Sequence, residues 1–240
     1  MTTTTTTYIQ ALALGLDPAW RRQSDEARHD DGCRFATALE EGGLEGARTI
    51  TYSSIGIEPG VDLLLWRMAP AVDVLESTAA AFLRAGLGRW LTVRESLIGR
   101  ISPSQYVRKP TEQEQSLFTG ERSRFLVVYP FTKSTDWYLL SKEARQGVMN
   151  EHMRVGHQYP TVRQALAYSF GLDSQDFVVA YETDDLPAFS DLVRDLRATE
   201  SRRSTVSDTP ILLGIHRQIE DILTLLGASA PQHADAEMSR

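Results

Sequence analysis

The chain has 240 residues, of which 42% are hydrophobic, enough for one large domain or two small fused ones and too apolar for a disordered chain. Its 25 Lys and Arg against 32 Asp and Glu give a net charge of −7, which argues against sequence-independent binding to nucleic acid because phosphate contacts need a basic surface. The single cysteine, Cys33, excludes an intramolecular disulfide and a cysteine-rich zinc site. We therefore expect a soluble protein, and the cysteine content favours a cytoplasmic location.

The N-terminal segment carries few structural signals. It begins MTTTTTTYIQ, without a basic stretch followed by an apolar run, so we expect no secretory signal. No window of the chain holds about 18 consecutive apolar residues, and we expect no membrane span. The threonine run and the charge-dense residues 19–31 predict a loosely ordered arm over residues 1–33.

Apolar patterning predicts an α+β unit over residues 34–120. Its expected elements are strands over residues 49–57, 61–68 and 90–101 and a helix over residues 72–85. The sequence Glu58-Pro59-Gly60 is typical of a turn between the first two strands. The polar residues 108–123 are typical of a linker or surface loop.

A second α+β unit is predicted over residues 121–228. Its expected elements are strands over residues 124–129, 162–170, 177–182 and 211–214 and helices over residues 141–157, 185–199 and 217–226. Ser141 is suited to cap the first of these helices. Residues 229–240 are expected to form a flexible tail. The two units repeat one strand–strand–helix–strand theme, which indicates two related units packed together.

The residues alone assign no chemistry. His152 and His157 share one helix, but a separation of five residues places them roughly 140° apart, so they cannot chelate one metal. Taken singly, Tyr129 is typical of a core tyrosine, Lys133 of a solvated lysine and Trp137 of a packing anchor. The usual nucleotide-binding and hydrolase motifs are missing.

Longer stretches resemble a known family. The run YPFTKSTDWYLLSKEARQGVMNEHMRVGHQYPTVRQ and the later run YSFGLDSQDFVVAYETDDLPAFSDLVRDLRATESRR resemble the C-terminal half of the chlorite dismutase and coproheme decarboxylase family. TYSSIGIEPGVDLLLWRMAP, the helix after it and GLGRWL are similar, more weakly, to the family's N-terminal unit. The resemblance implies two fused ferredoxin-like units of the dimeric α+β barrel type. Each would be an antiparallel sheet with helices on one face, and the protein would be a homo-oligomer, usually a pentamer.

The resemblance also implies an iron-porphyrin in the C-terminal unit. His152 falls on the position of the axial iron ligand, and Glu200 falls on the carboxylate that accepts its other ring N–H. Lys133 and Trp137 match the family's pocket lysine and tryptophan, which suit anionic propionates and a flat macrocycle. Arg203 is a further candidate for a propionate contact.

Two positions bear on which chemistry is performed. Chlorite-dismutating members carry a distal arginine, and counting seven residues back from Gly171 places Gln164 there, whereas Arg163 should point to the opposite face of the strand. Coproheme decarboxylases of one bacterial branch carry a glutamine at this position and a tyrosine before the proline of the YPFTK loop, here Tyr129. Both positions favour decarboxylation, with Tyr129 relaying an electron and a proton.

Three hypotheses stay open. In the first, hydrogen peroxide drives conversion of iron-coproporphyrin III to haem b, with Tyr129, Lys133 and Gln164 as catalytic residues and a ferrochelatase as the source of substrate and a possible transient partner. In the second, the protein is a chlorite dismutase, which requires Arg163 to face the iron. In the third, it is a haem-binding sensor or carrier without fast turnover.

Overall fold

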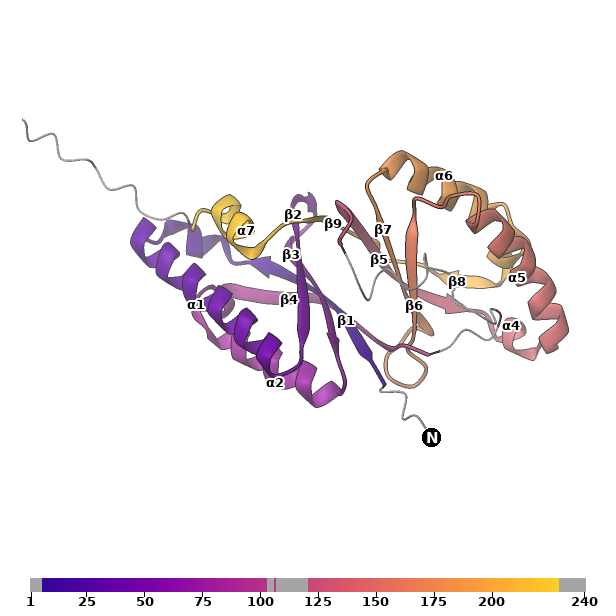
Figure 1. Ribbon diagram of the computed structural model, residues 1–240, viewed down its shortest axis with the longest axis horizontal. Helices are drawn as coiled ribbons and strands as arrows, with labels where there is room; N and C mark the ends of the chain where they lie inside the picture. The colour runs from indigo at the N-terminus through magenta and orange to yellow at the C-terminus, as the bar shows by residue number, and fades with distance from the viewer. Residues whose placement is uncertain (1–5, 103–105, 107–120, 229–240) are drawn as a thin grey trace, which may run out of the picture.

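A computed structural model describes residues 6–102, 106 and 121–228 of the chain (Figure 1). The elements of its first part are β1 (Tyr8–Leu16), η1 (Pro18–Arg22), α1 (Asp25–Leu44), β2 (Arg48–Glu58), β3 (Val61–Ala69), α2 (Val72–Arg84), η2 (Gly86–Trp90) and β4 (Leu91–Arg100). Those of its second part are β5 (Phe125–Lys133), α4 (Thr135–Leu139), α5 (Lys142–Gly156), β6 (Arg163–Tyr168), β7 (Phe177–Thr183), α6 (Leu186–Arg197), η3 (Glu200–Ser204), β8 (Thr205–Ser207), β9 (Leu212–His216) and α7 (Ile219–Leu226). Most of the predicted linker and the predicted tail lie outside the described residues.

Both halves repeat one order of elements. The first half runs β1-α1-β2-β3-α2-β4, and the second runs β5-α5-β6-β7-α6-β9, with the short α4 and β8 added. Each is a strand–helix–strand–strand–helix–strand series, which is the ferredoxin-like arrangement. The predicted fold class of two fused ferredoxin-like units is confirmed.

The strands of the two units join into one ring. The sheet order is β7-β6-β4-β1-β3-β2-β9-β5-β8, and β5 also pairs with β7, so eight antiparallel strands close on themselves. The junctions between the units are short: Arg100 pairs with Tyr168 on one side, and Tyr52 pairs with His216 on the other. Figure 1 shows the strands between two groups of helices. Closure removes the unpaired edges of these eight strands.

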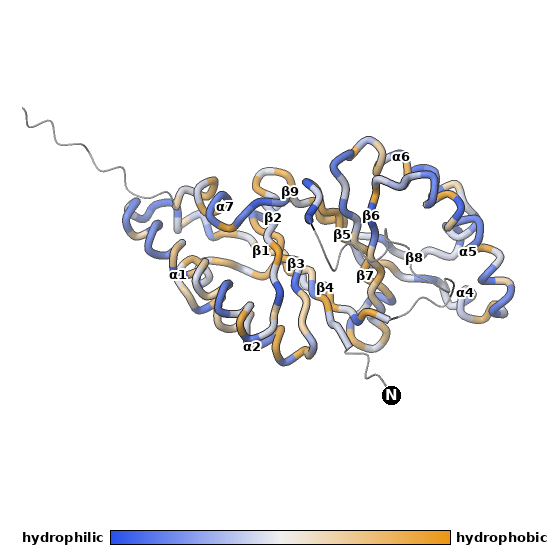
Figure 2. Tube along the Cα trace, in the orientation of Figure 1, coloured by the Kyte–Doolittle hydropathy of each residue, from blue (hydrophilic) through white to orange (hydrophobic). Residues whose placement is uncertain are grey.

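The interior of the ring is the largest core cluster. All eight ring strands contribute side chains from one face, as the alternation of a β-strand requires. Small residues on some strands, among them Ala11, Ala167 and Ala180, leave room for large ones such as Tyr52 and Trp66. The hydrophobic colouring of the central strands in Figure 2 follows this core. Of the further clusters, one lies under α1, α2 and α7, one lies under α6, and a small one is formed by Ala47, Ala69 and Leu75.

The prediction of a loosely ordered arm over residues 1–33 is wrong for residues 8–33, which form β1, η1 and the first part of α1. Strand β1 lies between β3 and β4, and its residues from Ala11 to Leu16 are buried. Ser24 caps α1, whose charged residues stay largely on the exposed face while Phe35 packs into the core under the helix. The strand begins directly after the low-complexity threonine run, and the dense charge belongs to the exposed face of a helix.

No helix within the described residues is long and apolar enough to cross a membrane.

Candidate functional site

The outer face of the second unit is only partly covered. Helix α6 packs on it through Phe189, Leu192 and Leu196, against Val179 and Tyr181 of β7. Helix α5 contacts α6 and η3, yet none of its residues is buried. On the sheet, Leu166 lies directly opposite Val179 and is still 42% exposed. The exposed Leu166 leaves part of this apolar face available to a flat apolar ligand.

His152 is a half-buried imidazole on α5. Its Nδ1 lies 3.0 Å from Ser201 Oγ, and its Nε2 has no hydrogen-bond partner among the residues that the structure describes. Burial, followed by the positive charge of Lys133, lowers the pKa of His152 to about 4. The ring is therefore neutral near neutral pH, which is the form that ligates a metal. His157, by contrast, is exposed at the end of the helix.

Lys133 is a buried cation on aromatic walls. Its side chain ends β5, with Nζ 4.5 Å from the ring centroid of Trp137 and 5.1 Å from that of Phe131. Nζ donates a hydrogen bond to the carbonyl oxygen of Ser201 at 2.8 Å. Burial, and then the charge of Arg202, lower the pKa of Lys133 to about 8. An ammonium group has three donors, so Lys133 retains the capacity to bind an anionic oxygen.

Tyr129 and Gln164 share the open face of the sheet. Gln164 pairs in register with Tyr181, and the ring of Tyr181 stacks on that of Tyr129 with centroids 6.0 Å apart. The phenol of Tyr181 is therefore a close neighbour of the phenol of Tyr129. Burial and this contact raise the pKa of Tyr129 well above its ordinary value, so its phenol keeps its proton.

Arg163 points to the other face of the sheet. It donates to Glu182 Oε2 at 2.9 Å and to Ser123 Oγ at 2.8 Å. Glu182 is fully buried and also accepts from the hydroxyl of Tyr52 at 2.7 Å, across the junction of the two units. Arg163 therefore belongs to a buried ion cluster of the ring and not to the face that carries Tyr129.

The structure corrects the assignment of Glu200. Its carboxylate pairs with Arg203 at 3.4 Å and is half exposed, while the hydrogen-bond partner of His152 Nδ1 is the next residue, Ser201. The side chain of Arg203 is mostly exposed, which also removes it from the buried group around Lys133. The family pattern located this segment correctly, but η3 turns Ser201 inward and Glu200 outward.

Three residues of the site were missed at the level of sequence: Thr199, Ser201 and Tyr181. Thr199 precedes a short 3-10 helix and Ser201 lies within it, and no periodicity marks which residues of this segment face inward. Tyr181 could have been found, because the alternation of residues 177–182 places it on the face opposite to Glu182. What the sequence lacked was the register between β5 and β7.

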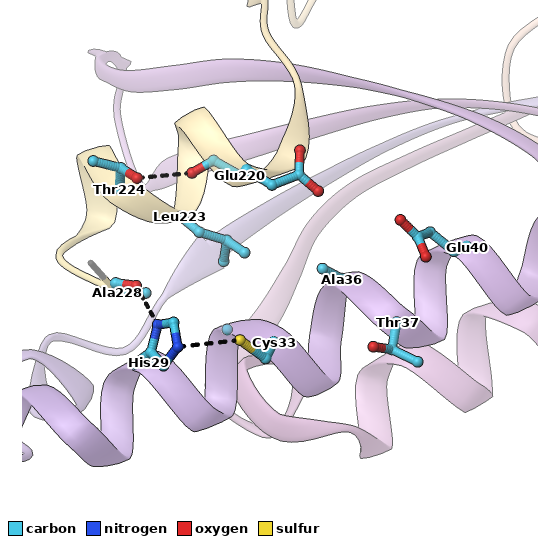
Figure 3. Close-up of a pocket in the computed structure, with 10 residues that line it drawn as sticks. His29, Cys33, Ala36, Thr37, Glu40, Glu220, Leu223, Thr224 and Ala228 are labelled. Carbon is cyan, nitrogen blue, oxygen red and sulfur yellow. Dashed lines mark hydrogen bonds between the residues drawn. The ribbon is translucent and has the colours of Figure 1, made fainter. Parts of the chain in front are cut away.

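A pocket of about 350 Å³ lies elsewhere, between α1 and α7 of the first unit (Figure 3). Within it, His29 Nε2 is 3.6 Å from Cys33 Sγ, and His29 Nδ1 faces the carbonyl oxygen of Ala228 at 3.5 Å. Across the part of the chain that the structure describes, no three His, Cys, Asp or Glu side chains are grouped to hold a metal. The pocket is separate from the face that carries His152.

Comparisons with known proteins agree with this geometry. The family profile described as chlorite dismutase matches residues 28–217. The chain is 32% identical to coproheme decarboxylase of Mycolicibacterium smegmatis over 184 residues, which cover 73% of this chain and 75% of the relative. It is 27% identical to chlorite dismutase of Ideonella dechloratans over 183 residues, covering 73% of this chain and 64% of the relative. The solved structure of chlorite dismutase from Candidatus Nitrospira defluvii in complex with imidazole superposes with a TM-score of 0.84 at 27% identity, covering 92% of this chain and 95% of that one.

Proposed function

Because this chain belongs to the chlorite dismutase family, whose members are haem-binding oxidoreductases, we propose that it is a coproheme decarboxylase that uses hydrogen peroxide. Its substrate would be iron-coproporphyrin III and its product haem b. The proposal is supported by the relative from Mycolicibacterium smegmatis, which carries that name. The observation that carries it is the shared sheet face of Tyr129 and Gln164, from which Arg163 is turned away.

The donor set fits an iron-porphyrin. His152 would offer a neutral Nε2 as an iron ligand, and Lys133 would offer a cation for a propionate. Leu166, which is 42% exposed, offers apolar surface for the macrocycle, while the buried Trp137 supports Lys133. When bound, the iron-porphyrin supplies, together with hydrogen peroxide, the oxidising power of the reaction.

Tyr129 is proposed to transfer the hydrogen. Losing one electron and its hydroxyl proton, its oxygen can take a hydrogen atom from the β-carbon of a propionate. One further electron then leaves the substrate, and carbon dioxide departs to give a vinyl group. Each propionate consumes one peroxide and one proton and releases one carbon dioxide and two water molecules, so atoms and charge balance. The raised pKa of Tyr129 keeps the hydroxyl hydrogen in place until it is needed.

Lys133 and Gln164 are proposed to orient the substrate. The Lys133 ammonium, fixed by the Ser201 carbonyl and two aromatic rings, can neutralise a propionate at the edge of the site. Gln164, opposite Tyr181 on the open face, carries an amide that can donate to peroxide or to a propionate.

The experiment that tests this function compares Tyr129→Phe with Tyr8→Phe, a partly buried tyrosine of the first unit. Both variants should bind iron-coproporphyrin III with the wild-type affinity. Only Tyr129→Phe should lose conversion, by at least about 100-fold, because hydrogen transfer would have no carrier. Full conversion by Tyr129→Phe would refute the proposed role.

Chlorite dismutation is the second candidate, favoured by the relatives that bear that name. It requires a distal arginine, and the contacts of Arg163 with Glu182 and Ser123 count against it. A homo-oligomer, a pentamer by the family resemblance, is proposed as the working form. Light scattering of the purified protein tests that assembly.

A further inference from the structure

A chain of hydroxyl groups starts at His152. Nδ1 of His152 lies 3.0 Å from Ser201 Oγ, and Ser201 Oγ lies 3.1 Å from Thr199 Oγ1. Thr199 Oγ1 donates to the carbonyl oxygen of Leu196, near the end of α6, at 2.6 Å. Thr199 and Ser201 are both only 5% exposed, so water does not compete freely for these contacts.

The direction of each hydrogen bond in this series follows from its last acceptor, the carbonyl oxygen of Leu196. The carbonyl oxygen of Leu196 can only accept, so Thr199 spends its one hydroxyl hydrogen there. Thr199 Oγ1 must then accept from Ser201, which spends its own hydrogen in turn. Ser201 Oγ is left as an acceptor, and His152 Nδ1 must carry the hydrogen. The remaining ring nitrogen, Nε2, then holds a lone pair.

Nearby carboxylates do not replace this acceptor. Glu151, next to His152, accepts from the backbone N–H of Glu200 at 3.0 Å, and Glu200 pairs with Arg203. Lys133 Nζ, bonded to the Ser201 carbonyl, holds the backbone of η3 at this point. The histidine therefore donates to a neutral hydroxyl, which raises the basicity of a metal ligand less than a carboxylate does.

We propose that Ser201 and Thr199 are positioning residues for the axial ligand, which fix His152 in the tautomer whose Nε2 can bind porphyrin iron. This inference rests on the proposed function only in taking His152 as the iron ligand. It does not depend on whether the bound porphyrin is decarboxylated.

The test uses four variants of the full chain. Ser201→Ala removes the acceptor, and Thr199→Val keeps the shape of the side chain but frees the Ser201 hydroxyl to turn toward Nδ1. Ser201→Thr keeps a hydroxyl at this position and should therefore preserve the hydrogen-bond chain, called here the relay, that runs from His152 through Ser201 and Thr199 to Leu196. Ser204→Ala, in the same 3-10 segment, is the matched control, because among the described residues the Ser204 hydroxyl has no hydrogen-bond partner, while its backbone carbonyl accepts from the N–H of Ser134.

Two readouts are needed. Nitrogen-15 NMR of the histidines reports the His152 tautomer in the apoprotein, and resonance Raman reports the iron–histidine stretch in the loaded protein. We expect the Nδ1–H tautomer in the wild type, in Ser201→Thr and in Ser204→Ala, and a mixture in Ser201→Ala and Thr199→Val. Ser201→Ala should also shift the iron–histidine stretch and weaken iron-porphyrin affinity by about 10- to 100-fold.

The outcomes separate the two proposals. The relay would be overturned if wild-type His152 carried its hydrogen on Nε2. It would also be overturned if the tautomer were unchanged in both Ser201→Ala and Thr199→Val, whatever the activity of the protein. The expected NMR and Raman pattern in a protein that binds but does not decarboxylate its porphyrin would support the relay and overturn the proposed function.

Discussion

The rings of Tyr129 and Tyr181 stack with centroids 6.0 Å apart and ring planes 25° from parallel. They come from neighbouring strands, β5 and β7, and belong to the cluster that faces α6. The proposed hydrogen-transfer residue is thus held against a second phenol, which also helps to raise its pKa. We therefore expect the orientation of the Tyr129 hydroxyl to depend on the hydroxyl group of Tyr181.

Tyr181→Phe tests that dependence, because it removes the hydroxyl and keeps the stacked ring. The pKa of Tyr129 should fall toward its ordinary value, since Tyr181 is one of the causes that raise it, and burial should keep it above that value. Loss of the polar interaction between the two phenols, worth about 1 kcal/mol, should slow decarboxylation by roughly 5- to 10-fold. Ultraviolet titration of the apoprotein and stopped-flow conversion measure the two effects. An unchanged rate would show that the Tyr181 hydroxyl does not orient Tyr129.

Lys133 predicts a pH dependence of ligand binding. Its pKa in the apoprotein is lowered to about 8, and a propionate needs the charged ammonium. As pH rises through about 8, binding must be coupled to proton uptake, so affinity should fall by up to about tenfold per pH unit. Lys133→Met should bind more weakly at low pH and lose this step. Absorbance titrations with iron-coproporphyrin III across this range measure both, and a pH-independent wild-type affinity would contradict the role.

The lowered pKa of Lys133 also makes the stability of the apoprotein depend on pH. Between about 8, the folded-state pKa, and 10.5, its ordinary value, the unfolded chain holds the Lys133 proton more often than the folded one. This group's contribution to the unfolding free energy therefore rises with pH in that window. Denaturant titrations across this pH window measure the rise in the wild type, and the contribution of Lys133 to it should be absent from Lys133→Met.

Arg163→Ala should affect the fold and not the chemistry. It removes a partner of the fully buried Glu182, and breaking a buried pair costs about 3 kcal/mol. Gln164→Ala, on the half-buried opposite face, should change stability little and slow decarboxylation. Urea unfolding of the two apoproteins tests the contrast. Oxygen release from chlorite that Arg163→Ala abolishes would reverse the assignment and favour chlorite dismutation.

Strand β1 predicts that the N-terminal segment is essential to the core. Leu14 is fully buried, and Leu14→Ala should lower the unfolding free energy by about 2–5 kcal/mol through the cavity it leaves. Leu44→Ala, at a leucine that is 90% exposed, is the control and should change stability by less than about 0.5 kcal/mol. Equal effects of the two substitutions would contradict the placement of β1.

The sequence predicted most elements between residues 49 and 226, because their apolar periods match the faces that they bury. The prediction failed for β1 and α1, because a threonine run directly precedes the strand and the helix is dense in charge. Both elements are stabilised by the neighbouring strands and helices on which they pack. His152 could be singled out only through the family resemblance, since a helix histidine has no distinctive spacing. The partners Ser201 and Tyr181 depend on a loop conformation and a strand register, which local sequence does not encode.

The most direct test of the proposed function is a titration of hydrogen peroxide into the complex of the apoprotein with iron-coproporphyrin III, followed by mass spectrometry of the porphyrin. We predict two successive losses, each of one carbon dioxide and two hydrogens, at one peroxide per loss. A porphyrin that binds but keeps its mass would contradict decarboxylation, and chlorite would then be the substrate to test.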